Sequence, residues 1–431
     1  MALPISLAML VPQVNFITNN IFLGRLGEQE LASAGITGVY YLIFAVIGNG
    51  LNNGVQALIA RRAGQNLPKE IGRLFFHAVW IALTIASLGI TITYTFAPSV
   101  LRAVLHNPAI AEQVIDFLLI RIWGLPLLYL YIMRNALLVG TNNTRLLVWG
   151  TLSEAVVNIV LDYGLIYGNL GLPELGFNGA AYASIIAEGT GLVVIYAVIH
   201  IRKLHRSFAF FEETRVTWST FKTILVFSSP LIVQYSISIA SWEYFYILIE
   251  HHGERALAVS NSMRNIFGLF GIFSWAFAAT ANTMVSNVIG QDRRDEVLPL
   301  VRKIAKLSTG ISLCIFCLLN LVPAWFLSFY GQGDEFNQYG VPVVRVVSVG
   351  LLSMSFGTVW LNAVTGTANT RVNLMIEAIT LVIYCLYVYF VLEHFQMPIT
   401  WGWASEWIYW LSIFILAYGY MRSGRWKSKT I

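Results

Sequence analysis

The chain alternates long apolar runs with short polar segments along its whole length. Crossing ~30 Å of hydrocarbon takes about twenty helical residues, and twelve runs are long enough to do so. They lie at about 2–23, 33–60, 72–97, 115–140, 146–166, 179–201, 221–249, 257–289, 304–327, 340–366, 372–392 and 401–421. The pattern predicts an all-α integral membrane protein with twelve transmembrane helices.

Composition and charge agree with a membrane protein and set its orientation. Hydrophobic residues make up 57% of the chain and charged residues 11%, so water is not the solvent for most of its surface. Nineteen Lys and Arg residues fall in the loops and tail on one side of the predicted membrane, and only Arg25, Arg102 and Arg255 in the loops on the other. The positive-inside rule therefore places both termini in the cytoplasm. The net charge of +5 is explained without a nucleic-acid partner.

The sequence repeats itself at an offset of 226 residues. Pro4 falls on Pro230, Gly64 on Gly290, and the segment GTNNTR at 140–145 on GTANTR at 366–371. Because an even number of spans precedes the second copy, the halves share one orientation and form two parallel six-helix repeats. We expect the two GTxNTR segments to form matching cytoplasmic turns. The predicted organisation is an N-terminal six-helix half at 1–201, a cytoplasmic linker at 202–220, a C-terminal six-helix half at 221–421 and a basic cytoplasmic tail at 422–431.

Several loose motifs, in order and correctly spaced, resemble the multidrug and toxic compound extrusion (MATE) family over essentially the whole chain. They are the LG…LA pattern at 26–32, the AxxxGQ pattern at 60–65, GTNNTR at 140–145, NIVLDYGLIYG at 158–168 and GAAYAS at 179–184. The resemblance implies a V-shaped bundle that exports amphipathic, often cationic drugs or metabolites in exchange for H⁺ or Na⁺ by alternating access. It further implies a monomer in the bacterial plasma (inner) membrane, with lipid and small molecules as partners and no cofactor besides the coupling ion.

A cation site can be placed from the residues themselves. Asn158 and Asp162 lie four residues apart on the fifth span, and Glu154 extends the same helix face. A carboxylate inside a membrane costs at least ~2.5 kcal/mol, so it should face a cavity or a partner. Asn19 on the first span and Ser184 on the sixth lie at the depth of Asp162, counted from the span ends. These five residues could hold Na⁺ or exchange a proton. The alternative is that Asn19 and Asp162 only cross-link two helices.

The first span departs from the family pattern at its polar residue. The resemblance implies an aspartate eight residues before Gly27, where this chain has Asn19. An asparagine can coordinate Na⁺ through its carbonyl but cannot carry a proton, so a titrating role would pass to Asp162 or Glu154. Pro4 stands where family members with a bending first helix also carry proline. Pro12 removes a helical hydrogen bond in mid-span, which makes bending easy.

Other charged residues within the spans are open to more than one interpretation. Glu243 and Arg264 lie at similar depth on consecutive helices, and we expect an ion pair between them, with a Na⁺ site in the C-terminal half as the alternative. Glu188 either lines the substrate cleft or pairs with Arg121 or Arg134. Glu377 is close to the inner membrane face and is expected to extend toward water. No metal site beyond the possible Na⁺ site is predicted.

Three other functions fit the sequence less well. A flippase for a lipid-linked precursor would share the fold, but related flippases have a strongly basic cavity, whereas the charges here are mixed and include Glu154, Glu188 and Glu243. An intramembrane enzyme is disfavoured because no HExxH, GxSxG or paired-aspartate protease motif is present. A channel is disfavoured because the polar groups are confined to each half. A cation-coupled exporter fits the sequence best.

Overall fold

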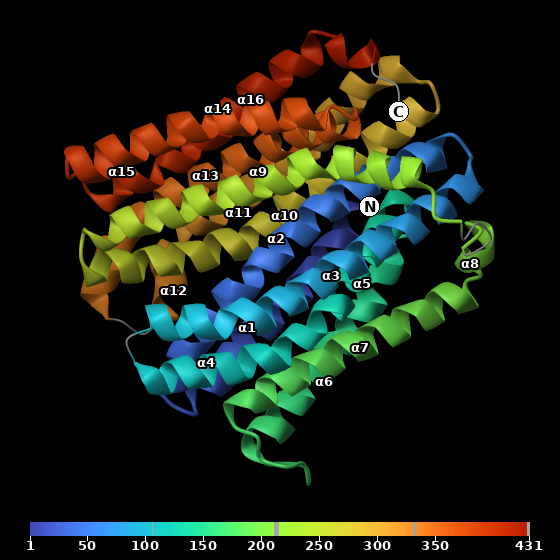
Figure 1. The fold of residues 1–431 in the computed structure, drawn as a ribbon. Coiled ribbons are helices and arrows are strands. Elements are labelled where there is room, and N and C mark those ends of the chain that lie inside the picture. Colours follow the sequence, from blue (N-terminus) through green and yellow to red (C-terminus); the bar gives the residue numbers. More distant parts are fainter. Residues whose placement is uncertain (106, 211–214, 331–332, 429–431) are drawn as a thin grey trace. The chain divides into compact units, whose positions relative to one another are not determined.

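The computed structural model describes residues 1–105, 107–210, 215–330 and 333–428, apart from the side chains of residues 16, 28, 31 and 32. Every regular element in these ranges is helical (Figure 1). The α-helices are α1 Ala2–Gly24, α2 Glu28–Gly64, α3 Pro68–Val104, α4 Pro108–Arg121, α5 Leu125–Gly140, α6 Leu147–Tyr167, α7 Phe177–Ile201, α8 Leu204–Ser207, α9 Trp218–Glu250, α10 Glu254–Gly290, α11 Val297–Leu321, α12 Pro323–Ser328, α13 Asp334–Gly366, α14 Thr370–Val388, α15 Ile399–Trp403 and α16 Ser405–Arg422. Short 3-10 segments are η1 Ile122–Gly124, η2 Thr144–Leu146, η3 Arg294–Glu296 and η5 Arg425–Ser428, and η4 Tyr389–His394 is a π-helix.

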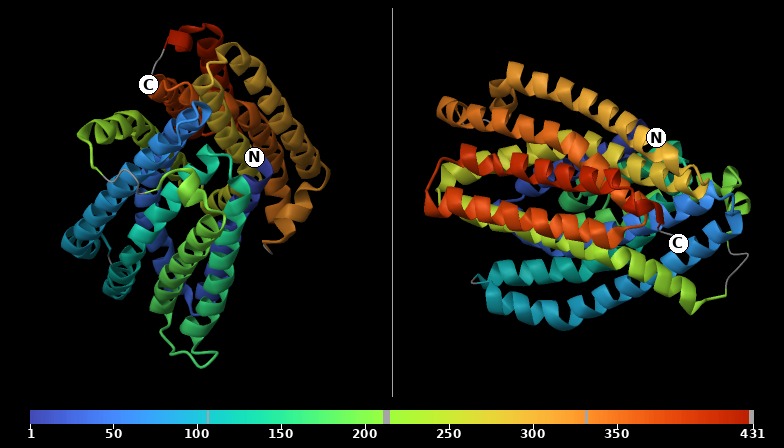
Figure 2. Two further views of the ribbon diagram at one scale, coloured as in Figure 1. Left: turned by 90° about the vertical axis from the view of Figure 1, so that its right-hand side faces the viewer. Right: turned by 90° about the horizontal axis from the view of Figure 1, so that it is seen from above.

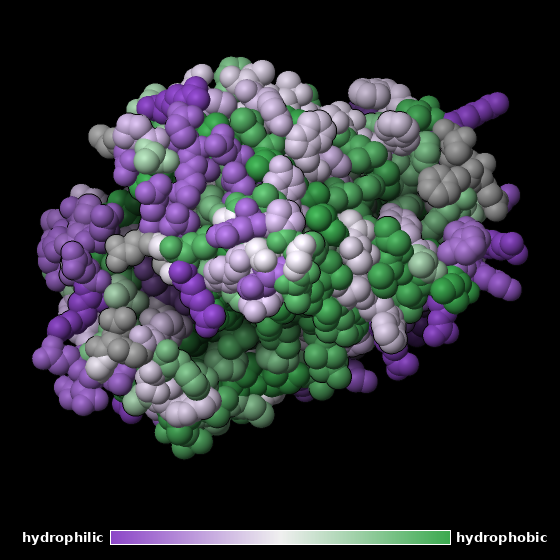
Figure 3. Space-filling model, turned by 90° about the horizontal axis from the view of Figure 1, so that it is seen from below, coloured by the Kyte–Doolittle hydropathy of each residue, from purple (hydrophilic) through white to green (hydrophobic). Residues whose placement is uncertain are grey.

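The membrane-spanning character predicted from the apolar runs is confirmed. Eleven helices in the described part of the chain are long and apolar enough to cross a membrane, and α15 with α16 occupies the twelfth predicted span. On the face drawn in Figure 3, hydrophobic side chains cover a broad part of the surface. The protein is a multi-pass, all-α membrane protein.

Two predicted spans are interrupted where proline removes a backbone donor. The ninth predicted span ends early because Pro323 starts the separate helix α12 after α11 has ended at Leu321. The fourth span contains the 3-10 turn Ile122–Gly124 immediately before α5, whose second residue is Pro126. Neither break was predicted, because the mean hydropathy of a span does not change when proline removes one backbone hydrogen bond.

The internal repeat is visible in the helix boundaries. Helix α2 and helix α10 begin and end at positions that differ by 226 residues, and the span Pro108–Gly140 corresponds in the same way to α13, Asp334–Gly366. The chain divides into two compact units, Leu3–Val226 and the part from Phe227 onward. We call these the N-terminal and C-terminal units. Within each unit the long helices run side by side (Figures 1 and 2).

The two GTxNTR turns have matching local structure. Asn142 and Ala368 occupy equivalent positions with positive φ, 60° and 75°. Asn143 Nδ2 donates to Thr141 Oγ1 at 3.0 Å, and Asn369 Nδ2 donates to Thr367 Oγ1 at the same distance. Each asparagine thus closes the turn that follows a long helix, as the repeat predicted.

The predicted bounds of the two halves, the linker and the tail remain predictions. The linker assigned to 202–220 contains α8 and the start of α9, and its residues 211–214 lie outside the described ranges. The tail assigned to 422–431 contains η5, and its residues 429–431 also lie outside them.

Candidate functional site

The ends of α1, α6 and α7 meet in a small apolar layer of the N-terminal unit. Leu23, Ile166, Phe177 and Ala180 are buried together in it, and we call these four residues the end layer. The Tyr167 hydroxyl donates to the Phe22 carbonyl at 2.6 Å, and the two rings contact edge to face at 6.0 Å between centroids. The end layer fixes the depth of α1 relative to α6 and α7.

The polar residues predicted for the cation site lie one helical turn from this layer. Asn19 is four residues before Leu23, Asp162 four before Ile166, and Ser184 four after Ala180 on a helix that runs the other way. Residues four apart share a helix face. The three polar side chains are therefore carried on the faces that meet in the end layer, each about 6 Å along its helix from it.

Asp162 is the most unusual group at this level. Its side chain is 0% exposed, and neither carboxylate oxygen has a hydrogen-bond partner among the described residues. Asn158, one turn away, is also buried with Nδ2 unpartnered, and Asn19 has a buried, unpartnered Oδ1. Buried polar atoms without partners are costly. The oxygens of Asp162, Asn19 and Ser184 are of the type that hard cations prefer.

The internal repeat supports the conclusion that α1 and α6 face each other near Asn19 and Asn158. The positions equivalent to Asn19 and Asn158 in the C-terminal unit are Phe245 and Tyr384, whose rings are 6.3 Å apart. The position equivalent to Asp162 is Val388. The same helix contact is thus apolar and aromatic in one unit and polar in the other. The contact in the C-terminal unit shows that these two helices can pack together without a charged residue. The polar residues at the same contact in the N-terminal unit therefore call for a functional reason.

Glu154 belongs to a second cluster, two turns farther along α6. Its side chain lies against Gly191 of α7, close enough to Glu188, Arg134 and Arg121 to interact electrostatically with all three. Eight residues of helix separate it from Asp162, about 12 Å. The five residues predicted as one cation site are therefore divided between two levels.

Glu188 is held in a buried ion pair. Arg121 Nη2 and Nη1 donate to its two carboxylate oxygens at 2.5 and 3.2 Å, and the guanidinium lies 4.1 Å from the centroid of the Tyr41 ring. Of the alternatives left open by the sequence, the structure selects the pair with Arg121. Arg134 instead lies over the ring of Tyr131, at 3.9 Å.

Helix α1 is the least enclosed of the apolar helices. Only 12% of its apolar window is buried, against 33% to 72% for the other described spans. It runs unbroken through Pro12, which is exposed, while Leu23 at its far end is buried in the end layer. Pro4 lies in its first turn. The helix is thus held near the cation-site residues and loosely packed where proline weakens it.

The close approach of α7 to α6 depends on Gly179. A Cβ at this position would lie 2.5 Å from the Leu165 carbonyl oxygen and 3.0 Å from Ile166 N, both backbone atoms of α6. We expect Gly179→Ala to destabilise the protein by about 1–3 kcal/mol, because α6 must move away from α7 beside Asp162. Gly189→Ala on the same helix is the control, since its nearest atom would lie at 3.8 Å. Denaturant unfolding in mixed micelles measures both, and equal stability of the two variants would contradict this packing.

Two expectations for the C-terminal unit are wrong. None of the ion pairs among the described residues joins Arg264 to Glu243. The Arg264 guanidinium lies over the rings of Trp242 and Tyr246, at 5.3 and 5.7 Å. Glu377 does not extend toward water but is 0% exposed and accepts hydrogen bonds from neighbouring helices. Equal depth does not specify which way a side chain points around its helix.

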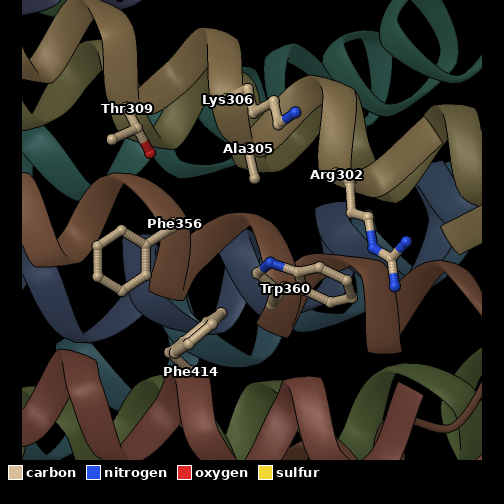
Figure 4. Close-up of a pocket in the computed structure, with 7 residues that line it drawn as sticks. All are labelled: Arg302, Ala305, Lys306, Thr309, Phe356, Trp360 and Phe414. Atoms are coloured by element: carbon tan, nitrogen blue, oxygen red, sulfur yellow. The ribbon is translucent and has the colours of Figure 1, made fainter. Parts of the chain in front are cut away.

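A shallow groove of about 410 Å³ lies in the C-terminal unit (Figure 4). Arg302 and Lys306 of α11 stand along one side, opposite the rings of Phe356, Trp360 and Phe414. No motif or spacing in the sequence pointed to these residues. Two positive charges repel a cationic molecule, so this groove is a poor candidate for cationic cargo, and the chemistry of interest lies with Asp162.

Comparison with known proteins agrees with the fold and the repeat. A curated relative from Agrobacterium fabrum, a probable multidrug resistance protein NorM, is 23% identical over 370 residues, which are 84% of this chain and 79% of the relative. A protein of the same name from Thermotoga maritima is 21% identical and covers 96% of this chain and 89% of its own length.

Solved structures show the same fold. An outward-facing multidrug resistance MATE family transporter of the MOP superfamily matches with a TM-score of 0.89 at 19% identity, over 100% of this chain and 96% of that chain. A MOP superfamily transporter from Pyrococcus furiosus matches with a TM-score of 0.87 at 17% identity, over the same shares.

The family model MatE matches twice, at residues 4–164 and 230–390. The two matches are displaced by the 226 residues of the internal repeat. Together they cover well over half of the sequence, and the chain therefore belongs to the MatE family, the multidrug and toxic compound extrusion transporters.

Proposed function

We propose that the protein is a cation-coupled antiporter that exports amphipathic, cationic drugs or metabolites in exchange for H⁺ or Na⁺. The observation that carries the proposal is the buried carboxylate of Asp162, which has no hydrogen-bond partner among the described residues. It lies one turn from the end layer, as Asn19 on α1 and Ser184 on α7 do. Relatives named as multidrug resistance proteins support the cargo class. Membership of a transporter family excludes an enzyme.

Asp162, Asn158, Asn19 and Ser184 form the coupling site in this proposal. Asp162 supplies the charge, and the amide and hydroxyl oxygens of the other three complete an oxygen-rich environment for a cation. Glu154 belongs to the second cluster, two turns from Asp162 on α6. There its carboxylate interacts electrostatically with Arg134 and with the Arg121–Glu188 pair. Glu243 and Arg264 are assigned to substrate contact in the C-terminal half, with Arg264 held by aromatic rings.

Coupling requires that the cation bind one conformation more tightly than the other. Binding next to Asn19 acts on the end of α1 that is anchored by Leu23, and Pro12 allows the remainder of this loosely packed helix to bend. Bending in turn alters the affinity for drug as the two halves rock between outward-open and inward-open forms. We place both termini in the cytoplasm of a bacterial cell and treat the monomer as the working unit.

Efflux from proteoliposomes tests the proposal. Purified protein is reconstituted, loaded with a fluorescent amphipathic cation, and given either a pH gradient or a Na⁺ gradient of equal size. We expect one of the two gradients to drive efflux above the level without a gradient. Efflux that responds to neither gradient, in vesicles shown to contain folded protein, would exclude coupled antiport.

The alternative function is export of a lipid-linked precursor. The Arg121–Glu188 pair and the neighbouring Glu154 make the charges of the N-terminal unit mixed rather than basic, which favours cationic or neutral cargo. Transfer of a fluorescent polyprenyl pyrophosphate across the vesicle membrane, with no efflux of amphipathic cations, would favour the flippase instead.

A further inference from the structure

Glu377 of α14 is a buried acid that the coupling site does not use. Its side chain is 0% exposed. One carboxylate oxygen, Oε1, lies 2.5 Å from Ser238 Oγ of α9 and 2.5 Å from the Tyr409 hydroxyl of α16, and Oε2 accepts from Gln234 Nε2 of α9 at 3.3 Å. The equivalent position in the N-terminal unit is Thr151. The acid is therefore not a feature of the repeated fold.

The groups around Oε1 are hydroxyls. Ser238 Oγ and the Tyr409 hydroxyl both lie within hydrogen-bond distance of this carboxylate oxygen. A hydroxyl can donate its one hydrogen and can also accept a hydrogen bond, so these partners suit both an ionised and a protonated carboxyl group.

Counting hydrogens shows that the site suits both protonation states of Glu377. Ser238 Oγ is 2.5 Å from Glu377 Oε1 and also 2.9 Å from the Gln234 carbonyl oxygen, but a hydroxyl has one hydrogen to donate. When the carboxylate is ionised, Ser238 donates to it. When Oε1 is protonated, Glu377 donates to Ser238 Oγ, and Ser238 donates to the Gln234 carbonyl. In both states Tyr409 donates to Oε1, so no polar group is left without a partner.

In the part of the chain that the structure describes, the partners of Glu377 are uncharged. From α9 it meets Gln234 and Ser238, and from α16 Tyr409; no Arg, Lys or His side chain pairs with it within the described ranges. The other ionisable groups close by are Glu406 and Tyr384, which interact electrostatically with each other. Glu406 is itself buried, accepts from Trp410 Nε1 at 2.9 Å and lies three residues before Tyr409.

Buried hydroxyl groups continue from Glu377 toward Glu406. Thr380, one turn after Glu377, is 0% exposed, and its Oγ1 has no hydrogen-bond partner among the described residues. The Tyr384 hydroxyl and Ser405 Oγ are also buried and interact with each other, and the Tyr384 ring is 5.7 Å from that of Tyr409. Hydroxyl groups can both accept and donate a proton.

We propose that Glu377 is a proton-exchange site in the C-terminal unit, separate from the coupling site around Asp162, at which Ser238 and Tyr409 hold the carboxyl group in both its ionised and its protonated form. The proton taken up from water bonds to Oε1, and the Ser238 hydrogen turns from the carboxylate to the Gln234 carbonyl. Release reverses both movements. No other bond is made or broken.

Proton binding by the purified full-length protein in detergent tests this site separately from Asp162. The number of protons taken up between alkaline and acidic pH is measured for the parent, Glu377→Gln, Asp162→Asn and the double variant. We expect Glu377→Gln to lose one proton per molecule in both the parent and the Asp162→Asn background, together with the infrared carbonyl band of a buried protonated carboxyl. Equal proton uptake by Glu377→Gln and the parent would overturn the proposal, whatever Asp162→Asn shows.

Ser238→Ala provides an independent arm with a matched control. Ser236 makes the same hydrogen bond to the carbonyl four residues earlier, at 2.9 Å, but it is exposed. We expect Ser238→Ala to raise, by about one unit, the pH at which the Glu377 carboxyl band has half its full intensity, because the ionised carboxylate then loses a strong hydrogen bond. Ser236→Ala should leave this pH unchanged. Identical curves for the two alanine variants and the parent would show that Ser238 does not respond to the proton.

Discussion

Asp162→Asn is expected to abolish cation-coupled efflux while the protein stays folded, or becomes more stable. The substitution removes the charge and keeps the shape of the side chain. Neither oxygen of Asp162 has a hydrogen-bond partner among the described residues, so no internal bond is lost. A buried amide costs less than a buried, unpaired carboxylate. Loss of transport without loss of stability is the signature of a residue kept for function.

Efflux at matched protein levels and denaturant unfolding measure the two effects. Asp116→Asn on α4 is the control, because Asp116 is an exposed acid of the same unit, and it should leave both quantities unchanged. Drug binding can survive in Asp162→Asn, since the proposed cargo contacts lie elsewhere. Normal gradient-driven efflux by Asp162→Asn would remove this residue from the coupling mechanism and leave Glu154 as the remaining acid on α6.

Glu188→Gln is expected to lower the free energy of unfolding by about 3–5 kcal/mol, because it leaves the Arg121 guanidinium buried without its counterion. Both side chains are largely buried, at 13% and 10% exposed. Arg121→Gln should cost a similar amount, and the double variant less than the sum of the two. Such a cycle isolates the energy of the pair.

The pair between Arg102 and Glu112 is a matched control. It has two short hydrogen bonds, at 2.6 and 2.9 Å, but its side chains are 57% and 52% exposed. Glu112→Gln should therefore cost under about 1 kcal/mol. If Glu188→Gln were as stable as Glu112→Gln and only lowered the affinity for cationic cargo, Glu188 would line the substrate path rather than hold helices together.

Features that depend on local periodicity followed from the sequence alone. The twelve apolar runs, the repeat at 226 residues and the GTxNTR turns need only helix length, hydropathy and the side chains within a few residues. The i,i+4 spacing of Asn158 and Asp162 likewise places both on one face of α6 without knowledge of any other helix. Counting residues from span ends also placed Asn19, Asp162 and Ser184 at one depth, and the end layer agrees with that count.

Tertiary structure decided how the buried charges are distributed around each helix. The depth of a residue in the membrane follows from counting along its own helix. Which partner its side chain meets depends on how that helix packs against helices that are distant in the chain. Glu188 meets Arg121 rather than Arg134, Arg264 meets aromatic rings rather than Glu243, and Glu154 joins a cluster apart from Asp162. Glu377 is buried because α9 and α16 cover it and supply three donors. An ion pair or a proton site needs atoms within about 3 Å of one another, and only the packing of whole helices determines which side chains come that close.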